Sequence, residues 1–331
     1  MNDHPQITWL MPVRNGMPYL PETLASLEAQ TYRNHTLLVW DNGSTDGTLE
    51  ELRRWIPSRL KGRIISDRPL GLGASLAALV ETAQTELCAR TDADDLSVPT
   101  RLEKQLDFLQ ANPGAAAVGT HVDFIDNDGR LMKDPWVFPL NDAEVRWGTR
   151  WRPLNLHGTF LLRRSKVLEA GNYRDCKPME DHDLLIRLSK VGELPNLPDK
   201  LYQWRRHTES VTVQIQDHHD YHREAARMNA DALFPGIPAG DAMRLWDLLY
   251  RADSSASARF SDLRLLHRAA QALAKAVGKH EDYFVNTPLY ADQRYHLRRR
   301  AAASLGLKPL LNLKQKLRTA LQPKATSAHH D

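Results

Sequence analysis

Residues Leu87–Asp95 have the sequence LCARTDADD, a short apolar run that ends directly in three carboxylates. A continuous apolar run of this length is typical of a buried strand in a parallel sheet. Side chains alternate along an extended segment, so we expect Asp92 and Asp94 to point the same way. In an open α/β sheet, ligands bind outside the carboxyl ends of the strands. The stretch therefore predicts an α/β protein with a polar site at the end of this strand.

The same pattern continues on both sides of this stretch. Short apolar runs alternate with amphipathic segments over the first ~200 residues, at the spacing typical of βα units. A turn-forming cluster, DNGSTDG at residues 41–47, places a second acidic group at a strand end. The turn Asp126–Gly129 is expected to join a hairpin. Strands are expected at residues 7–11, 36–40, 64–66, 87–91, 115–125 and 159–162, and helices at 20–27, 49–55, 73–85, 97–110 and 180–190.

Beyond about residue 214 the strand pattern disappears and helical periodicity takes over. We expect helices at residues 221–233, 241–251, 261–277 and 308–321. The sequence thus predicts an α/β domain over residues 1–214 and a helical C-terminal appendage over residues 215–331. The end of the chain is basic, because residues 290–331 hold nine Lys or Arg and only two Asp or Glu.

The composition excludes several classes of protein. The chain has 331 residues, 42% of them apolar and 26% charged, which is ordinary for a soluble globular protein. Cys88 and Cys176 are the only cysteines, so a disulfide scaffold is excluded and a reducing compartment is favoured. No apolar run approaches the roughly 20 residues that cross a bilayer, and the N-terminus has no signal-peptide pattern. We therefore expect a cytoplasmic protein.

The strand-end carboxylates are open to two interpretations. Asp92 and Asp94 are hard oxygen ligands, which can hold Mg²⁺ or Mn²⁺ while a substrate diphosphate completes the coordination. Alternatively, the acidic residues only cap the following helix, which is what we expect for Asp95. A nicotinamide cofactor is not expected, because Gly71-Leu72-Gly73 follows the third strand and Leu76 replaces the last glycine of a dinucleotide fingerprint.

Six segments between residues 6 and 212 resemble, in order, the motifs of the family 2 glycosyltransferases, which are inverting enzymes with the GT-A fold. MPVRNG at residues 11–16 is similar to the opening strand and loop, and DNGSTDGT at 41–48 to the nucleotide-binding turn, with Asn42 where a second Asp is usual. RTDADD at 90–95, followed by PTRLEKQ at 99–105, resembles the D-x-D region. HGT at 157–159 and RRS at 163–165 resemble the acceptor side, and ED at 180–181 resembles the catalytic pair. Arg206-His207 with Ser210 resembles the R-x-H…S element, with His directly after Arg.

The resemblance implies transfer of a sugar from a nucleotide-diphospho-sugar, with UDP the commonest nucleotide, to a saccharide or lipid-linked acceptor. Asp181 would be the general base. Asp94, with His207 as a tentative second ligand, would hold Mn²⁺ or Mg²⁺ against the leaving diphosphate. Glu180, His157 and Arg206 would lie on the acceptor side. The donor would be bound by Pro12, Val13, Asn15, Asp41, Ser44, Asp92 and Ala93.

Some of these assignments have structural alternatives. A carboxylate in the first turn of a helix, such as Asp181, is favoured by the helix dipole whatever its function. His207 and His157 are also interpretable as hydrogen-bonded structural histidines. His218 and His222 have a spacing that can bind zinc, but without a further ligand in view a solvated helix face is expected.

The resemblance also leaves the mode of action open. Arg146-Trp147 lacks the preceding Gln of the Q-x-x-R-W motif of processive synthases. We therefore expect transfer of one sugar per encounter, in the assembly of a surface glycan or a lipid-linked saccharide. The alternatives are a non-catalytic scaffold of a membrane glycan complex and a nucleotidyltransferase.

The basic tail has two interpretations as well. Its leucine face either attaches to an anionic surface on the inner side of the plasma membrane or packs on the protein. Nucleic acid is not expected as a partner, because the tail has few aromatic residues that could stack on bases.

Overall fold

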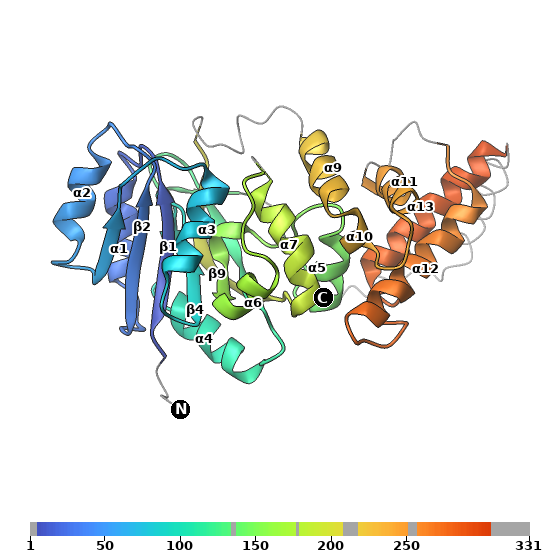
Figure 1. Cartoon of the computed structure of the whole chain (residues 1–331), viewed down its shortest axis with the longest axis horizontal. Helices are drawn as coiled ribbons and strands as arrows, with labels where there is room; N and C mark the ends of the chain where they lie inside the picture. Colours follow the sequence, from blue (N-terminus) through green and yellow to red (C-terminus); the bar gives the residue numbers. More distant parts are fainter. Residues whose placement is uncertain (1–4, 134–136, 177–178, 208–217, 251–256, 306–331) are drawn as a thin grey trace, which may run out of the picture.

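The computed structural model in Figure 1 describes residues 5–133, 137–176, 179–207, 218–250 and 257–305. Its strands are β1 (Ile7–Val13), β2 (His35–Asp41), β3 (Gly62–Ile65), β4 (Leu87–Arg90), β5 (Leu96–Ser97), β6 (Ala117–Ile125), β7 (Leu131–Met132), β8 (Leu161–Arg163) and β9 (Asn196–Arg205). Its helices in the first two thirds of the chain are α1 (Leu20–Glu28), α2 (Thr48–Trp55), α3 (Leu72–Thr82), α4 (Arg101–Ala111), α5 (Asp142–Gly148), the 3₁₀ helix η1 (His157–Thr159), α6 (Arg164–Glu169) and α7 (Glu180–Val191). The remaining helices are α9 (His218–Met228), α10 (Ala230–Leu233), α11 (Ala239–Tyr250), α12 (Phe260–Ala276) and α13 (Pro288–Ser304).

The strands form one sheet in the order β3-β2-β1-β4-β8-β6-β9-β5, with β7 paired to β6. The first four strands of this path are parallel to one another. β8 is antiparallel to both β4 and β6, and β9 returns parallel to β6. The expected α/β architecture with a mostly parallel sheet is therefore confirmed. The ends of β1, β2 and β4 lie at the same edge of the sheet, as parallel pairing requires.

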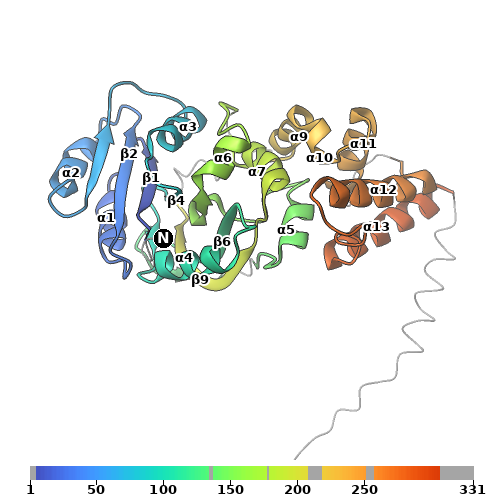
Figure 2. The same ribbon diagram turned by 60° about the horizontal axis from the view of Figure 1, so that its bottom comes forward.

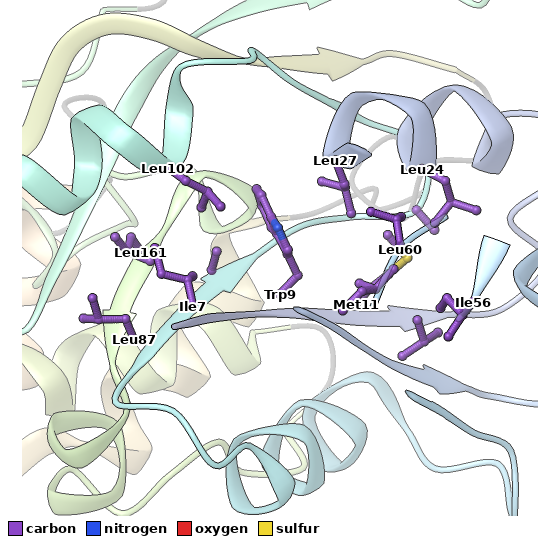
Figure 3. Close-up of a cluster of buried hydrophobic side chains, with 14 of the residues drawn as sticks. Ile7, Trp9, Met11, Leu24, Leu27, Ile56, Leu60, Leu87, Leu102 and Leu161 are labelled. Carbon is purple, nitrogen blue, oxygen red and sulfur yellow. The ribbon is translucent and has the colours of Figure 1, made fainter. Parts of the chain in front are cut away.

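Helices cover both faces of the sheet (Figures 1 and 2). β1 is buried along its whole length, which explains its continuous apolar sequence. On one face, Trp9 packs among leucines of α1 and α4, and Figure 3 shows its ring between Leu27 and Leu102. On the other face, Leu10 lies in a second cluster with residues of α3 and α7. The core thus holds both faces of the sheet and fixes the strand ends that carry the polar site.

The C-terminal helices lie at the end of the molecule opposite α2 (Figure 2). They share one apolar cluster with Trp147 and Trp151, which belong to α5 and the turn after it, and with Ile186 of α7. The expectation of a helical C-terminal region is confirmed. No helix in the described ranges is both long and apolar enough to cross a membrane.

Several elements differ from the sequence-based expectation. β9 is a strand that periodicity does not predict, because its burial pattern does not alternate and its pairing with β6 contains register shifts. The helix expected from residue 97 begins at Arg101, since Leu96 and Ser97 pair with β9. The helix expected over residues 221–233 is divided at Asn229 into α9 and α10. α13 was not expected either, and the helix expected over residues 308–321 lies outside the described residues.

Candidate active site

The loops that follow β1 and β2 are fastened to each other by hydrogen bonds in both directions. The Asn15 N–H donates to Ser44 Oγ and the Thr45 N–H donates to Asn15 Oδ1, both at 2.9 Å. The Gly16 N–H donates to Thr48 Oγ1 at 2.8 Å. Asn15 adopts a left-handed conformation with φ of 55°, which its short polar side chain tolerates. The two loops therefore form one continuous rim at this edge of the sheet.

The expected donor residues Pro12 and Val13 end β1, directly beneath this rim. Both are buried, and the Val13 carbonyl accepts a hydrogen bond from the Asn42 N–H at 2.7 Å. Asp41, at the end of β2, is also buried, and Ser44 Oγ donates to its Oδ1 at 2.5 Å. The hydroxyl of Ser44 thus orients the carboxylate of Asp41 at the strand end.

Asn42 stands where the family pattern usually has a second Asp, and the structure gives a reason. Its Oδ1 accepts from the Leu70 N–H at 2.8 Å, and its Nδ2 donates to Ser75 Oγ at 3.3 Å. A carboxylate could accept the first hydrogen bond but could not donate the second. The amide therefore joins the end of β2 to the start of α3.

The carboxylates after β4 alternate in exposure as the sequence predicts. The side chains of Asp92 and Asp94 are 39% and 32% exposed, whereas Asp95 is buried. Asp95 does not cap α4, whose N-cap residue is Thr100, so that expectation is wrong. Its Oδ1 instead accepts from the Arg205 N–H at 2.7 Å, and Asp95 therefore joins the end of β4 to β9.

Arg90 places a buried positive charge beside the first carboxylate. Its side chain is buried at the end of β4, and Nη2 donates to Asp92 Oδ1 at 2.6 Å. Burial opposes the charge of Arg90, but Asp92 and the nearby Tyr202 and Tyr173 outweigh it and raise the pKa. The Asp92 N–H donates to Tyr202 Oη at 3.1 Å, so the backbone of this turn is held as well. Ala93, between the two exposed carboxylates, is buried.

Asp94 has a histidine partner from the end of β9. Asp94 Oδ2 lies 2.9 Å from His207 Nε2, and the His207 ring packs on Tyr19 with centroids 5.1 Å apart. Burial and the negative charge of Asp92 together raise the pKa of Asp94. A bound cation would act in the opposite direction and favour the ionised carboxylate.

The described residues offer two protein ligands for a metal ion at this point. No three His, Cys, Asp or Glu side chains in the described ranges are arranged to hold a metal. Asp94 and His207 supply one oxygen and one nitrogen. The carboxylate of Asp94, with a diphosphate and water, fits Mn²⁺ or Mg²⁺, whereas the imidazole nitrogen of His207 fits Mn²⁺ better than Mg²⁺.

The R-x-H spacing is met by Arg205 and His207. The buried guanidinium of Arg205 donates to the Asp94 carbonyl at 2.9 Å and to Glu22 Oε2 at 2.7 Å. Arg206, which the sequence pattern placed in this role, instead lies over an aromatic ring of β6 at 4.3 Å from its centroid. Arg205 therefore supports the Asp94 turn, and Arg206 contributes to the neighbouring surface.

The catalytic pair expected from the sequence lies in the first turn of α7. Glu180 is buried, and its Oε2 has no hydrogen-bond partner among the described residues. Burial and the adjacent Asp181 raise the pKa of Glu180 to about 7. Burial also raises the pKa of Asp181 to about 6, although the His182 N–H donates to its Oδ1 at 2.6 Å. Both carboxyl groups thus titrate near neutral pH.

The carboxylates after β4 and those of α7 belong to one site. The positive charge of Arg90 lowers the pKa of both Glu180 and Asp181, and the negative charge of Asp92 raises it. α3 packs against the same region at Gly73, because a Cβ added to Gly73 would lie only 3.2 Å from the Glu180 Cβ. Segments far apart in the sequence therefore meet around the end of β4.

The turn η1 forms another wall of this site. His157 Nε2 lies 2.7 Å from Tyr173 Oη, and burial together with the charge of Arg90 holds the pKa of His157 well below its usual range. The next residue, Gly158, lies so close to Asp92 that a Cβ would be 3.0 Å from Asp92 Oδ2. His157 is thus a neutral, hydrogen-bonded histidine beside the carboxylates.

The structure therefore brings most of the expected site residues to one edge of the sheet. Arg90, Tyr202 and Arg205 also belong to this arrangement, and the sequence reasoning did not select them. Arg205 has a local signal in its spacing from His207, and Arg90 directly precedes the D-x-D turn. Tyr202 has no local signal, because its partners Asp92 and Asp95 are brought to it only by β9.

Comparisons with known proteins agree with this geometry. The family model described as Glycosyl transferase family 2 matches residues 8–170. The amylovoran biosynthesis glycosyltransferase AmsE of Erwinia amylovora is 30% identical over 197 residues, which cover 58% of this chain and 72% of that protein. The putative glycosyltransferase EpsE of Bacillus subtilis (strain 168) is 32% identical over 217 residues, covering 63% and 76%.

A solved structure extends the likeness to the C-terminal helices. S. aureus TarS 1–349, in complex with UDP-GlcNAc, matches with a TM-score of 0.61 at 15% sequence identity, over 95% of this chain and 92% of that one. This likeness concerns the fold, and it agrees with the GT-A architecture expected from the motifs. The chain therefore belongs to glycosyl transferase family 2, and it is a glycosyltransferase with the GT-A fold.

Proposed function

We propose that this chain transfers one sugar per encounter, with inversion, from a nucleotide-diphospho-sugar to an acceptor hydroxyl in polysaccharide biosynthesis. The observation that carries the proposal is that the paired Arg90 and Asp92, at the end of β4, lie near enough to Asp181 of α7 for their charges to change its pKa. A leaving diphosphate needs positive charge, and an acceptor hydroxyl needs a base placed on the other side of the sugar. The site contains groups suited to both requirements.

Asp181 is the general base in this proposal. With a pKa of about 6, Asp181 is mostly ionised at pH 7, but a larger fraction of it is protonated than of an ordinary aspartate. Such a carboxylate accepts a proton more readily than one with a pKa near 4. Glu180 and His157 line the acceptor side, together with the surface that contains Arg206.

The donor lies, in this proposal, along the rim of β1 and β2. Pro12, Val13 and Asn15 contact the nucleotide together with Asp41 and Ser44, and Asp92 and Ala93 lie toward the diphosphate. The fixed hydrogen bonds of this rim support the assignment, because a preformed pocket loses less entropy on binding. TarS, of similar fold, has been solved with UDP-GlcNAc and with UDP. A UDP-sugar is therefore the donor we propose.

Asp94 and His207 would hold the divalent cation. When bound, such an ion neutralises charge that develops on the leaving diphosphate. The chain's own part is to keep the carboxylate in place: Arg205 binds the backbone of Asp94, and His207 binds its side chain. Attachment of the basic tail to an anionic membrane surface remains a proposal from composition. Arg298, Arg299 and Arg300 of this tail lie in α13, and residues 306–331 lie outside the described ranges.

The experiment that tests the proposal replaces Asp181 with Asn. The variant keeps the size and polarity of the side chain but cannot accept the proton, so transfer should fall by about a hundredfold or more. Binding of UDP with Mn²⁺ should persist, and it is measured as a rise in the melting temperature. The anomeric configuration of the product, read by NMR, tests inversion.

Two further variants complete the design. Asp175→Asn alters an exposed aspartate in the segment before α7 and should leave transfer unchanged. Asp94→Ala should abolish the part of the thermal shift that depends on Mn²⁺. Wild-type turnover that survives Asp181→Asn would refute the role of the base. Nucleotide binding without any transfer by the wild type would favour the scaffold interpretation.

A further inference from the structure

A pair of histidines joins α9 to the first turn of α7, next to the proposed base. His182 follows Asp181 directly and is fully buried. Its Nε2 lies 2.8 Å from the carbonyl oxygen of Thr149, and its Nδ1 lies 3.0 Å from Nδ1 of His222 on α9. The two rings meet edge to face, with centroids 4.8 Å apart. The expectation that His222 lies on a solvated helix face is therefore wrong.

The chemistry of these contacts fixes where the protons are. A carbonyl oxygen can only accept, so His182 must carry its proton on Nε2 to bond Thr149. Burial lowers the pKa of His182 to about 3, with a further contribution from His222, so the ring is neutral. Its Nδ1 then has only a lone pair, and His222 must donate to it from its own Nδ1–H. His182 is thus fixed as the tautomer protonated at Nε2, and His222 as a donor from Nδ1.

The arrangement bears on the geometry of Asp181. α7 begins at Met179 as N-cap, and no side chain caps it by a hydrogen bond. The first turn is held on one side by Asp183, which binds Arg187 and Asn229. On the other side it is held through the His182 ring, between Thr149 at the end of α5 and His222 on α9. The backbone N–H of the same His182 donates to Asp181 Oδ1 at 2.6 Å. A change in the position of His182 therefore moves a hydrogen-bond donor of the base.

We propose that His222 is a positioning residue for sugar transfer, which acts through His182 to hold the carboxylate of Asp181. In this way a helix of the C-terminal region takes part in the reaction without contacting a substrate. The inference rests on the role proposed above for Asp181. It predicts a loss in the chemical step rather than in donor binding, because only the placement of the base changes.

The test compares substitutions of His222 in the full chain. His222→Phe keeps an aromatic ring but has no N–H donor, and it should lower kcat about 10- to 100-fold while KM for the donor changes less than about twofold. His222→Asn places an amide N–H close to the position of Nδ1 and should restore kcat to within about threefold. The rate is the release of nucleoside diphosphate from UDP-GlcNAc, UDP-Glc or GDP-Man, using whichever the wild type consumes fastest.

His219 provides a matched control on the same helix. Its ring packs on Trp246 and Tyr250, with centroids 5.4 and 5.1 Å away. His219→Phe should therefore leave kcat within about twofold of the wild type, since aromatic packing is conserved. Equal losses in His219→Phe and His222→Phe would mean that packing of α9 matters and would overturn the proposal.

Two measurements keep the proposal testable if His222→Phe fails to fold. His222→Gln moves the amide away from the Nδ1 position, so it should be less active than His222→Asn; equal activities contradict the inference. NMR of ¹⁵N-histidine in the wild type should show His182 protonated at Nε2 and His222 at Nδ1. The opposite tautomer at His222 overturns it. If Asp181→Asn abolishes transfer while His222→Phe does not, this inference fails and the proposed function stands.

Discussion

Glu180 is a buried carboxyl group whose Oε2 has no hydrogen-bond partner in the part of the chain that the structure describes. Burial and the adjacent Asp181 disfavour its ionised form and raise its pKa; Asp92 adds to this effect, and the positive charge of Arg90 opposes it. An unfolded chain would ionise the same group near its ordinary pKa of 4.5. The folded protein therefore loses stability when Glu180 ionises, and the site holds a charge arrangement that folding alone would not favour.

We expect Glu180→Gln to be more stable than the wild type at pH 8. Between pH 4.5 and 7 the folded wild type retains a proton that the unfolded chain has released. Its free energy of unfolding therefore falls as the pH rises through this interval. The variant has no charge at this position and avoids the loss, by on the order of 3 kcal/mol at pH 8. Urea denaturation at pH 8 and pH 4 measures the difference.

The difference in the free energy of unfolding between Glu180→Gln and the wild type should disappear at pH 4, because Glu180 is protonated there in both the folded and the unfolded state. Glu50→Gln is the matched control, because Glu50 also lies in the first turn of a helix but is exposed. It should show no such dependence on pH. A difference for Glu180→Gln that is the same at both pH values would contradict the assigned shift in pKa.

At the scale of elements, η1, β4 and β9 meet without room for a side chain at Gly158. A Cβ there would lie 2.5 Å from Tyr202 Oη and 3.0 Å from Asp92 Oδ2. Gly158→Ala should therefore push η1 away from the carboxylates. We expect activity to fall about tenfold or more, and the free energy of unfolding to fall by about 1–3 kcal/mol. Transfer assays and urea denaturation measure the two effects.

Gly240→Ala serves as the control for this substitution. Gly240 lies in α11, and nothing is within 4 Å of the position that its Cβ would take. The variant should keep full activity, and its melting temperature should not fall, because Ala favours a helix over Gly. If Gly158→Ala behaves like Gly240→Ala, then η1 does not constrain the site.

The elements differ in how well the sequence predicts them. β1, β2 and β4 are predicted because continuous apolar runs between turn residues reflect burial on both faces. β9 is missed because its burial pattern does not alternate, and Pro198 and Asp199 interrupt its apolar sequence. α13 is missed although Thr287 caps it, with a side chain that accepts from the Tyr290 N–H, and Pro288 starts it. Its weakly amphipathic sequence hides a helix whose boundary signal is clear.

The same distinction holds for the site. Asp92, Asp94 and Asp41 are predicted because each follows a strand that is recognisable on its own. The pairing of His182 with His222 depends on how α9 packs on α7, and no local pattern reports it. Contacts that arise only from tertiary packing therefore leave no local pattern by which the sequence could predict them.

At the scale of the whole molecule, Trp147 connects the two parts of the chain. It is fully buried against Phe284, with ring centroids 5.8 Å apart, and its Nε1 donates to Gln293 at 2.7 Å. The division that we propose near residue 214 thus separates two sequence patterns that share one apolar cluster. We expect the two parts to unfold together.

Trp147→Ala should lower the free energy of unfolding by about 3–5 kcal/mol. Unfolding followed by far-UV circular dichroism and by tryptophan fluorescence should still give one coincident transition, since removing the contact weakens both parts. Phe260→Ala, which truncates a ring that is 42% exposed on α12, should cost less than about 1 kcal/mol. Two separated transitions in the wild type would contradict this linkage.

The hydrogen bond from Trp147 to Gln293 spans 146 residues of chain. During synthesis at about 5–20 residues per second, Trp147 would leave the ribosome on the order of ten seconds before Gln293 exists. The pairs β1–β2 and β2–β3 need only nearby segments and can form in that interval. The nascent chain therefore holds an apolar surface around α5 until its last helices emerge, and a chaperone that binds exposed aromatic residues would meet this protein there.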